Sequence, residues 1–251
     1  MKINASRFRQ AFKAMTVHFG LSLLVAAVVA LLVFTLWFPY PYRELAGGRE
    51  LFILVMAVDI VCGPLLTFVL FSPTKPKKEL LTDISLIAFI QILALSYGIW
   101  TVWQVRPLYL VQEADRFNII SRASIDTKNI SSLPAELKPR FFSAPIKVSL
   151  LNIDESQREN LLNEMRAGGK DASERPSFYA QYDGSQAYKN GHPMRDLLIT
   201  QPDQKTAIAN LVEMTPSKDL NQLRYIYIVG RGYWIAVLNP NGEVIGYIET
   251  Q

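Results

Sequence analysis

The sequence predicts a membrane protein in which three transmembrane helices are followed by an α+β domain with an antiparallel sheet. Two observations predict this fold class. Charged residues are almost absent from three long apolar stretches within residues 1–106. Residues 107–251, by contrast, contain strand-like and helix-like segments separated by turn residues. We therefore expect a membrane domain over residues 1–106 and a separate domain over residues 107–251.

The apolar stretches predict spans near Val17–Phe38, Leu51–Phe71 and Ile84–Val105, and Asp59 is the only Asp, Glu, Lys or Arg inside them. A helix needs about 20 apolar residues to cross a hydrocarbon core of about 30 Å. Buried core helices of a soluble domain seldom supply three such runs so close together. The first run exceeds the apolar region of a signal peptide, which is about 7–15 residues. We expect it to be retained.

The basic residues predict the orientation in the membrane. Four Lys or Arg residues precede the first span, and Lys75, Lys77 and Lys78 lie between the second and third spans. Lys and Arg favour the cytoplasmic side, so we expect a cytoplasmic N-terminus and the 107–251 domain on the far side. The formal net charge of +4 therefore belongs to the membrane edge. A nucleic-acid-binding protein would need a basic stripe on a folded domain, so we set this class aside.

Asp59 is the strongest candidate for a functional residue in the membrane domain. A carboxylate within a membrane is costly and is a functional hypothesis by default. Counting helical rise places Ser96 and Tyr97 at about the same depth as Asp59, and Gln91 deeper toward the cytoplasm. Two interpretations remain open. Asp59 either hydrogen-bonds Tyr97 or Ser96 within the bundle, or meets a polar group on the helix of another protein.

Two further features of the spans concern helix packing. Ser22, Ala26 and Ala30 recur every four residues, which gives the first span a small-residue face that lets another helix approach closely. That helix belongs either to the bundle or to a partner. Pro64 cannot donate a backbone hydrogen bond, so a kink or hinge is expected in the second span. The lone cysteine, Cys62, excludes an intrachain disulfide.

Residues 107–251 contain signals for both helices and strands. A helix is expected over Asp154–Ala167, capped by Asp154 and ended by Gly168-Gly169, with Leu161, Leu162 and Met165 on its buried face. Shorter helices are expected near Met194–Ile199 and Asp203–Glu213. The Asn241-Gly242 pair predicts a hairpin. Alternating or β-branched runs predict strands over Leu108–Glu113, Phe117–Ser121, Ile146–Asn152, Leu223–Val229, Tyr233–Leu238 and Val244–Ile248.

This domain carries no recognisable catalytic pattern. There is no Cys/His cluster for zinc and no nucleophile elbow or phosphate-binding loop, so we expect a non-enzymatic protein without a cofactor or metal. Tyr179, Tyr182 and Arg231 are the binding-surface candidates, since Tyr and Arg often anchor interfaces. Core packing is the alternative for each tyrosine.

Many residues match one known family. The sequence resembles the type IV pilin accessory proteins of the TfpX/TfpZ kind, with one departure at Asn239, where that family usually has Asp. The residues that carry the resemblance are Arg43-Glu44-Leu45, Gly48, Glu50-Leu51-Phe52, Asp59, Gly63-Pro64-Leu65-Leu66-Thr67, Lys77, Glu79-Leu80, Asp83, Gln91, Ala94-Leu95, Tyr97-Gly98, Arg106-Pro107, Asp115-Arg116-Phe117, Pro176, Tyr179, Tyr182, Trp234 and Asn241-Gly242-Glu243.

The resemblance implies a bacterial inner-membrane protein with a periplasmic C-terminal domain, which binds its cognate major or minor type IV pilin as a chaperone or assembly modulator. Other pilus assembly proteins are further partners it implies. Such pilins cross the membrane with a long apolar N-terminal helix that carries a Glu near its start. The candidate contacts are Ser22, Ala26, Ala30, Asp59, Pro64, Gln91 and Tyr97 for that helix, and Tyr179, Tyr182 and Arg231 for the pilin head.

Two other function classes stay open. One is a membrane-anchored periplasmic sensor or ligand-binding protein, which predicts a small-molecule pocket in the 107–251 domain. It also needs a signalling output, and the cytoplasmic side offers only a short tail and the Lys75–Lys78 loop. The other is a membrane enzyme that uses Asp59.

Overall fold

The computed structural model describes residues 5–213, 215 and 218–250. The chain divides into two compact units. The first comprises Met1–Leu36 and Gly47–Gln104, and the second comprises Trp37–Ala46 and Val105–Gln251. The connection between the first two long helices thus belongs to the second unit, although the sequence led us to expect the whole of 1–106 to form the membrane domain.

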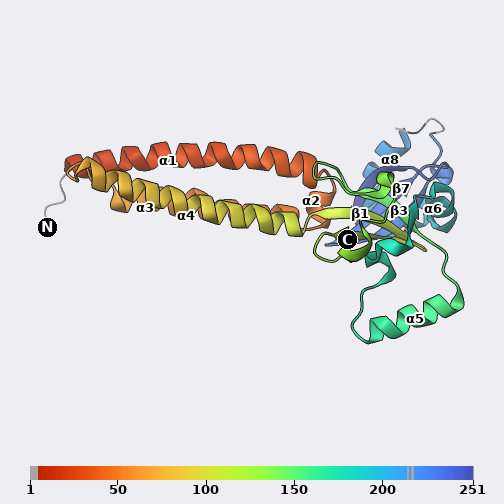
Figure 1. The fold of residues 1–251 in the computed structure, drawn as a ribbon. Helices are drawn as coiled ribbons and strands as arrows, with labels where there is room; N and C mark the ends of the chain where they lie inside the picture. The colour runs from red at the N-terminus through yellow and green to blue at the C-terminus, as the bar shows by residue number, and fades with distance from the viewer. Residues whose placement is uncertain (1–4, 214, 216–217, 251) are drawn as a thin grey trace. The chain divides into compact units, whose positions relative to one another are not determined.

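The first unit contains three long helices, α1 (Ala5–Leu32), α3 (Gly48–Leu70) and α4 (Lys77–Gln104) (Figure 1). A π-helical segment, Val33–Trp37, continues α1. All three are long and apolar enough to cross a membrane, which confirms the prediction of three long apolar helices in this part of the chain. Each begins before its charge-free stretch, because polar residues continue a helix readily once its apolar part has formed.

The helix α3 lies between the other two and packs along both, whereas α1 and α4 barely touch within the described residues. Edge-to-face ring pairs join α1 and its π-helical end to α3, with centroids 5.4 Å apart for Phe8–Phe68 and 5.0 Å for Phe34–Phe52. On the other side, Gly98 of α4 lies against Val55 of α3, where an added Cβ would come within 2.1 Å of the valine Cγ1. Small residues thus set the spacing of α3 and α4.

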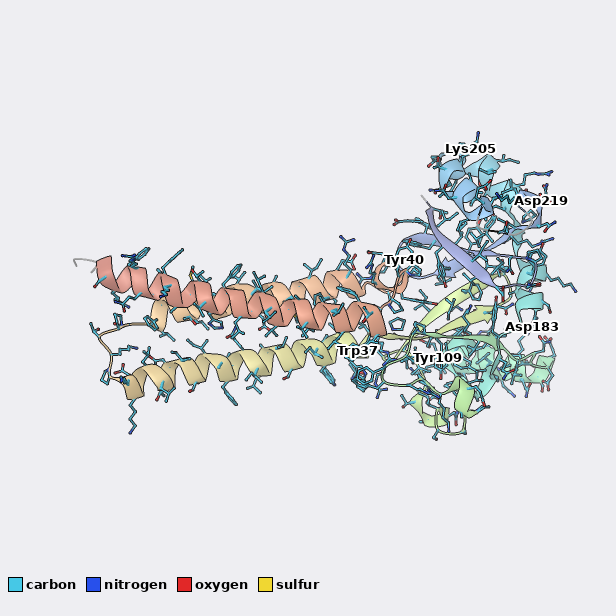
Figure 2. The ribbon with its side chains drawn as sticks, turned by 90° about the horizontal axis from the view of Figure 1, so that it is seen from above. Trp37, Tyr40, Tyr109, Asp183, Lys205 and Asp219 are labelled. Atoms are coloured by element: carbon cyan, nitrogen blue, oxygen red, sulfur yellow. The ribbon has the colours of Figure 1, made fainter. Side chains whose placement is uncertain are left out.

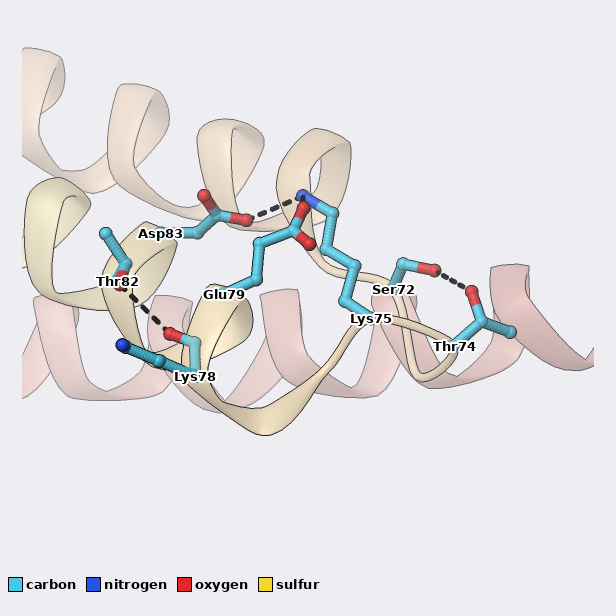
Figure 3. Close-up of polar contacts among 7 residues, drawn as sticks. All are labelled: Ser72, Thr74, Lys75, Lys78, Glu79, Thr82 and Asp83. Carbon is cyan, nitrogen blue, oxygen red and sulfur yellow. Dashed lines mark hydrogen bonds and ion pairs between the residues drawn. The ribbon is translucent and has the colours of Figure 1, made fainter.

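An ionic cluster holds the turn between α3 and α4 (Figure 3). Lys75 Nζ lies 2.6 Å from an Asp83 carboxylate oxygen and 3.4 Å from Glu79 Oε1. The hydrogen bond to Asp83 raises the pKa of Lys75. Ser72 and Thr74 share a hydroxyl hydrogen bond of 2.9 Å on the same turn. Because Lys75 is paired within the turn, Lys77 and Lys78 carry the remaining positive charge there.

The second unit is built on a mixed sheet with the strand order β4-β3-β1-β2-β6-β7-β8, and β5 pairs with β6. The β1–β3 and β2–β6 pairs are parallel and the other pairs are antiparallel. The strands are β1 (Pro107–Glu113), β2 (Arg116–Ser121), β3 (Ile146–Leu150), β4 (Tyr179–Gln181), β5 (His192–Pro193), β6 (Arg224–Val229), β7 (Tyr233–Leu238) and β8 (Val244–Thr250).

The sheet is mostly antiparallel, as predicted, and its two parallel pairs are features that the sequence did not indicate. The β1–β2 hairpin lies in the middle of the sheet, and long connections bring β3 to one of its edges and β6 to the other. Such non-local pairings leave no periodic signal in the sequence. The six strands that the sequence predicted are all present, and β4 and β5 are additional.

The helices of the second unit are α5 (Glu155–Arg166), α6 (Gly184–Asn190), α7 (Met194–Thr200) and α8 (Lys205–Glu213), besides the short α2 (Tyr42–Leu45). As predicted, Asp154 caps α5, and with Gln157 it forms a capping box. The predicted buried face is partly wrong: Leu161 is buried but Leu162 is exposed. The sequence did not predict α6, which Asp183 caps by accepting from the Gln186 amide (Figure 2).

The helix α2 belongs to the core of the second unit. Tyr42 and Leu45 are buried in the same cluster as Leu110, Phe117 and Ile226. The amide of Arg231, on the β6–β7 turn, donates to the Leu45 carbonyl at 2.7 Å. The α1–α3 connection is therefore a structural part of the second unit.

Candidate intramembrane groove

A groove runs along the first unit between α1, α3 and α4. It consists of two adjoining cavities of about 250 Å³ and 630 Å³, which share the lining residues His18, Leu21 and Ala88. The groove exists because α3 separates α1 from α4 along their length. We call it the helical groove.

The smaller cavity brings together four residues that the sequence predicted as a site. Ser22 and Ala26 line it from α1, Asp59 lines it from α3, and Gln91 lines it from α4. The remaining lining is apolar apart from His18. The small side chains of α1 leave this space open, and the carboxylate and amide provide its polar groups.

Gln91 is held in the groove by backbone contacts. Its Nε2 donates to the main-chain carbonyl of Asp59 at 3.4 Å. A Cβ added at Gly63 would lie 1.8 Å from the same nitrogen, so the amide occupies space that only glycine leaves. Within the Gly63-Pro64 pair, Gly63 therefore has a clear structural role, because its lack of a side chain leaves room for the Gln91 amide. Pro64 itself is buried, and α3 runs through it from Gly48 to Leu70.

The larger cavity contains residues that the sequence analysis missed. His18 of α1 and Thr67 of α3 share a hydrogen bond of 2.6 Å between Nδ1 and Oγ1. Both line the cavity, together with Lys13 and Gln10 toward the N-terminal end of α1. A histidine inside an otherwise apolar run was the available signal, because polar residues within spans usually face a bundle interior or a cavity.

One of the two open interpretations of Asp59 was a hydrogen bond to Tyr97 or Ser96. Among the described residues no hydrogen bond joins the Asp59 carboxylate to either side chain. Tyr97 is 69% exposed and stacks on Trp100 instead, with centroids 5.8 Å apart. The adjacent Gly98 faces α3, and one residue turns a helix by about 100°, which directs Tyr97 away from Asp59. Asp59 and Tyr97 therefore do not contact each other, although the sequence places them at about the same depth in the membrane.

Ala30 is half-buried on α1 but does not line the smaller cavity, which extends along α1 only from His18 to Ala26. The small-residue face is thus divided. Ser22 and Ala26 open onto the groove, and Ala30 lies one turn beyond it.

The binding-surface candidates of the second unit have different environments. Tyr179 is buried, its ring lies 4.8 Å from that of Tyr109, and its hydroxyl donates to the Ser173 carbonyl at 2.5 Å. Burial raises the pKa of both phenols. Of the two fates that the sequence allowed for Tyr179, core packing is therefore the one observed, because the turn-rich segment around it packs onto the sheet. Tyr182 is half-buried and donates to the Gly242 carbonyl at 2.6 Å, whereas Arg231 is exposed.

Within the described residues, no three His, Cys, Asp or Glu side chains gather where they could hold a metal ion. The groove can bind by shape and by hydrogen bonds. Its polar groups are few, among them the hydrogen-bonded His18–Thr67 pair, Asp59 and Gln91, and the rest of its wall is mostly apolar. Such a surface suits an apolar helix that carries an occasional polar side chain.

Comparisons with known proteins give a family. Residues 6–47 match the family described as fimbrial assembly protein FimB. The chain is 31% identical to the fimbrial assembly protein of serogroup I from Dichelobacter nodosus, over 98% of both chains. It is 36% identical to the serogroup E1 protein of the same organism over 72% of this chain and 70% of that one. It is 45% identical to the protein of serogroups C1 and C2 over 49% of this chain and 94% of the relative.

No solved structure matches the chain. The relatives support a broader family in place of the TfpX/TfpZ name that the resemblance gave. Because the identity of 31% extends along nearly the whole of both chains, this protein belongs to the fimbrial assembly protein family.

Proposed function

We propose that this protein is a pilus assembly factor that binds its cognate type IV pilin within the membrane and assists its assembly without catalysing a reaction. Membership of the fimbrial assembly protein family supports the pilus as the setting. The single observation that carries the proposal is the convergence of Ser22, Ala26, Asp59 and Gln91 on one groove between membrane-spanning helices.

The client of the groove is the N-terminal helix of the pilin. This helix is apolar and carries one glutamate near its start, according to the family resemblance. Small residues on α1 let its backbone approach, and the Gln91 amide and the His18 ring are hydrogen-bonding groups for the carboxyl group. Gln91 and His18 lie nearer than Asp59 to the Lys13 end of the groove, which is the end at which a pilin helix with the same orientation begins.

We place the protein in the bacterial inner membrane, with its N-terminus in the cytoplasm and its C-terminal domain in the periplasm. The Lys and Arg residues before the first span and at the Lys75–Lys78 turn support this orientation. The pilin head then lies on the same side as the C-terminal domain. Arg231 and the half-buried Tyr182 remain candidates for contacting the head.

The test is capture of the co-expressed pilin on affinity-tagged full-length protein from solubilised membranes. Ala26→Leu fills the groove with a larger side chain, whereas Ala27→Leu, at the exposed neighbouring position, adds the same atoms outside it. We expect Ala26→Leu to reduce pilin capture severalfold and Ala27→Leu to leave it unchanged. Equal capture by both variants at equal protein levels would contradict a groove-bound helix.

A ligand-binding role is the second candidate, because the second unit contains a cavity of about 520 Å³ between α5 and the ends of β1 and β3. Arg158 and Leu161 line it from α5, and Gln112 and Ser149 line it from the sheet. This role predicts that Leu161→Trp, which fills the cavity, abolishes pilus assembly while pilin capture is retained. Retained pilus assembly in that variant would argue against it.

A further inference from the structure

One exposed segment of the second unit combines aromatic and basic side chains. Residues 138–143 read Lys-Pro-Arg-Phe-Phe-Ser, and the phenyl rings of Phe141 and Phe142 are 52% and 67% exposed. The two rings pack edge to face with centroids 4.6 Å apart. Lys138 and Arg140 are exposed beside them, and no carboxylate among the described residues forms an ion pair with either. We call residues 138–143 the aromatic loop.

The aromatic loop is held in place through its backbone. The guanidinium of Arg106, a residue that is only 2% exposed, donates to the carbonyls of Phe141 at 2.5 Å, Arg140 at 2.6 Å and Ser143 at 2.9 Å. Trp37 Nε1 donates to the Phe141 carbonyl at 3.0 Å, and its ring lies 5.5 Å from the Phe141 ring. Two residues far apart in the chain thus fix one loop, and its phenyl groups remain on the surface.

Both of these residues are adjacent to membrane spans. Trp37 is the last residue of the first span, Ser6–Trp37, and Arg106 follows the end of the third span, Gln104, by two residues. Two residues of extended chain cover about 7 Å at most. The loop is therefore tied to two of the places where the chain leaves the membrane. Trp37, labelled in Figure 2, precedes α2 in the connection between the first two long helices.

We propose that the aromatic loop is a membrane-interface anchor, in which Phe141 and Phe142 enter the boundary between lipid headgroups and acyl chains while Lys138 and Arg140 contact anionic headgroups. Aromatic side chains are favoured at that depth, and basic residues near the surface are attracted to anionic lipids. The lipid belongs to the membrane that the three helices cross. This inference does not depend on the proposed pilin client.

Depth-dependent fluorescence quenching tests the anchor. The full-length protein, with Cys62 replaced by serine, receives a single cysteine at Phe142 or at Ile199. Ile199 is also an exposed apolar position, at 74%, but belongs to α7. Each variant is labelled with an environment-sensitive fluorophore and reconstituted into vesicles of phosphatidylcholine and phosphatidylglycerol. Spin-labelled lipids report burial in the membrane, and iodide reports exposure to water.

We expect spin-labelled lipid to quench the probe at Phe142 severalfold more strongly than the probe at Ile199, and iodide to quench it less. Replacing Lys138 and Arg140 together with glutamine should weaken the lipid quenching at Phe142, most clearly in vesicles that contain phosphatidylglycerol. Equal iodide quenching at the two positions would overturn the proposal. Protection of Phe142 that appears only when pilin is co-reconstituted would also overturn it, because the loop would then contact a protein.

Discussion

The side-chain amide of Gln91 on α4 lies over the Cα of Gly63 on α3, in the space that a side chain would need at that position. From there Gln91 donates to the carbonyl of Asp59. One α3 turn thus supplies the gap for the amide and the acceptor that orients it. This relationship fixes the polar part of the helical groove.

Gly63→Ala should displace Gln91 without unfolding the bundle. The new methyl would lie 1.8 Å from Gln91 Nε2, and a glutamine side chain is flexible enough to move away. The displaced amide then loses its bond to Asp59 and its fixed position on the wall of the groove. We expect Gly63→Ala to reduce pilin capture as much as Gln91→Ala does, while thermal stability in detergent changes little.

Gly20→Ala is the matched control, because a Cβ at Gly20 has no atom within 4 Å. It should leave both capture and stability unchanged. If Gly63→Ala retains full capture while Gln91→Ala loses it, the close approach of Gln91 to Gly63 does not position the amide.

Tyr42→Ala should destabilise the second unit although Tyr42 lies between two membrane spans. Its ring is buried in the sheet core, and burial raises its pKa. Truncating a large buried aromatic side chain costs about 3–5 kcal/mol. Denaturant unfolding of the full-length protein measures this loss, with resistance to proteolysis as the readout of the folded fraction. Tyr233→Ala is the control at a 75% exposed position, and an equal effect of both changes would refute the core role of α2.

Arg106→Lys should loosen the aromatic loop. Lysine carries a charge but lacks the planar fork that reaches three carbonyls at once. Burial, with Arg122 nearby, lowers the pKa of Arg106 to about 10, so the guanidinium remains charged at neutral pH. Losing a charged hydrogen bond costs about 1.5–3 kcal/mol.

Limited trypsin digestion measures this loosening as faster cleavage after Arg140. Arg116→Lys, on the exposed ion pair with Glu113, should leave the cleavage rate unchanged. Unaltered cleavage in Arg106→Lys would show that the loop is ordered by other contacts.

Acid should release the start of α5. The Gln157 amide and the Ser156 hydroxyl hydrogen-bond the Asp154 carboxylate and lower its pKa. A depressed pKa in the folded state stabilises the helix fully above about pH 4, and this stabilisation is lost as the pH falls through the lowered pKa. Hydrogen exchange at the first turn of α5 should therefore quicken in acid.

Asp154→Asn keeps a capping oxygen but does not titrate, so it should remove this pH dependence. The α7 helix, whose N-cap Pro193 has no side-chain bond, serves as the internal control. An unchanged acid response in Asp154→Asn would assign the effect to another group.

Local signals in the sequence were sufficient for the spans, for the cap of α5 and for the strands around Asn241-Gly242. Each of these depends on residues close together in the chain. The parallel strand pairs and the burial of Tyr42 and Leu45 depend on contacts between distant segments, which leave no periodic pattern. The groove was predicted in part. The four-residue spacing of small residues indicated Ser22 and Ala26, and the rarity of charged residues within an apolar span indicated Asp59. Only helix rotation decides that Gln91 faces Asp59 and that Tyr97 does not.

The most direct test of the helical groove as a pilin site is site-specific photo-crosslinking in intact membranes. A photoreactive amino acid at Ala88, which lines both cavities, is compared with the same group at the neighbouring exposed Phe89. We expect a crosslink to the transmembrane helix of the pilin from position 88 and little from position 89. A pilin adduct from position 89 with none from position 88 would contradict it.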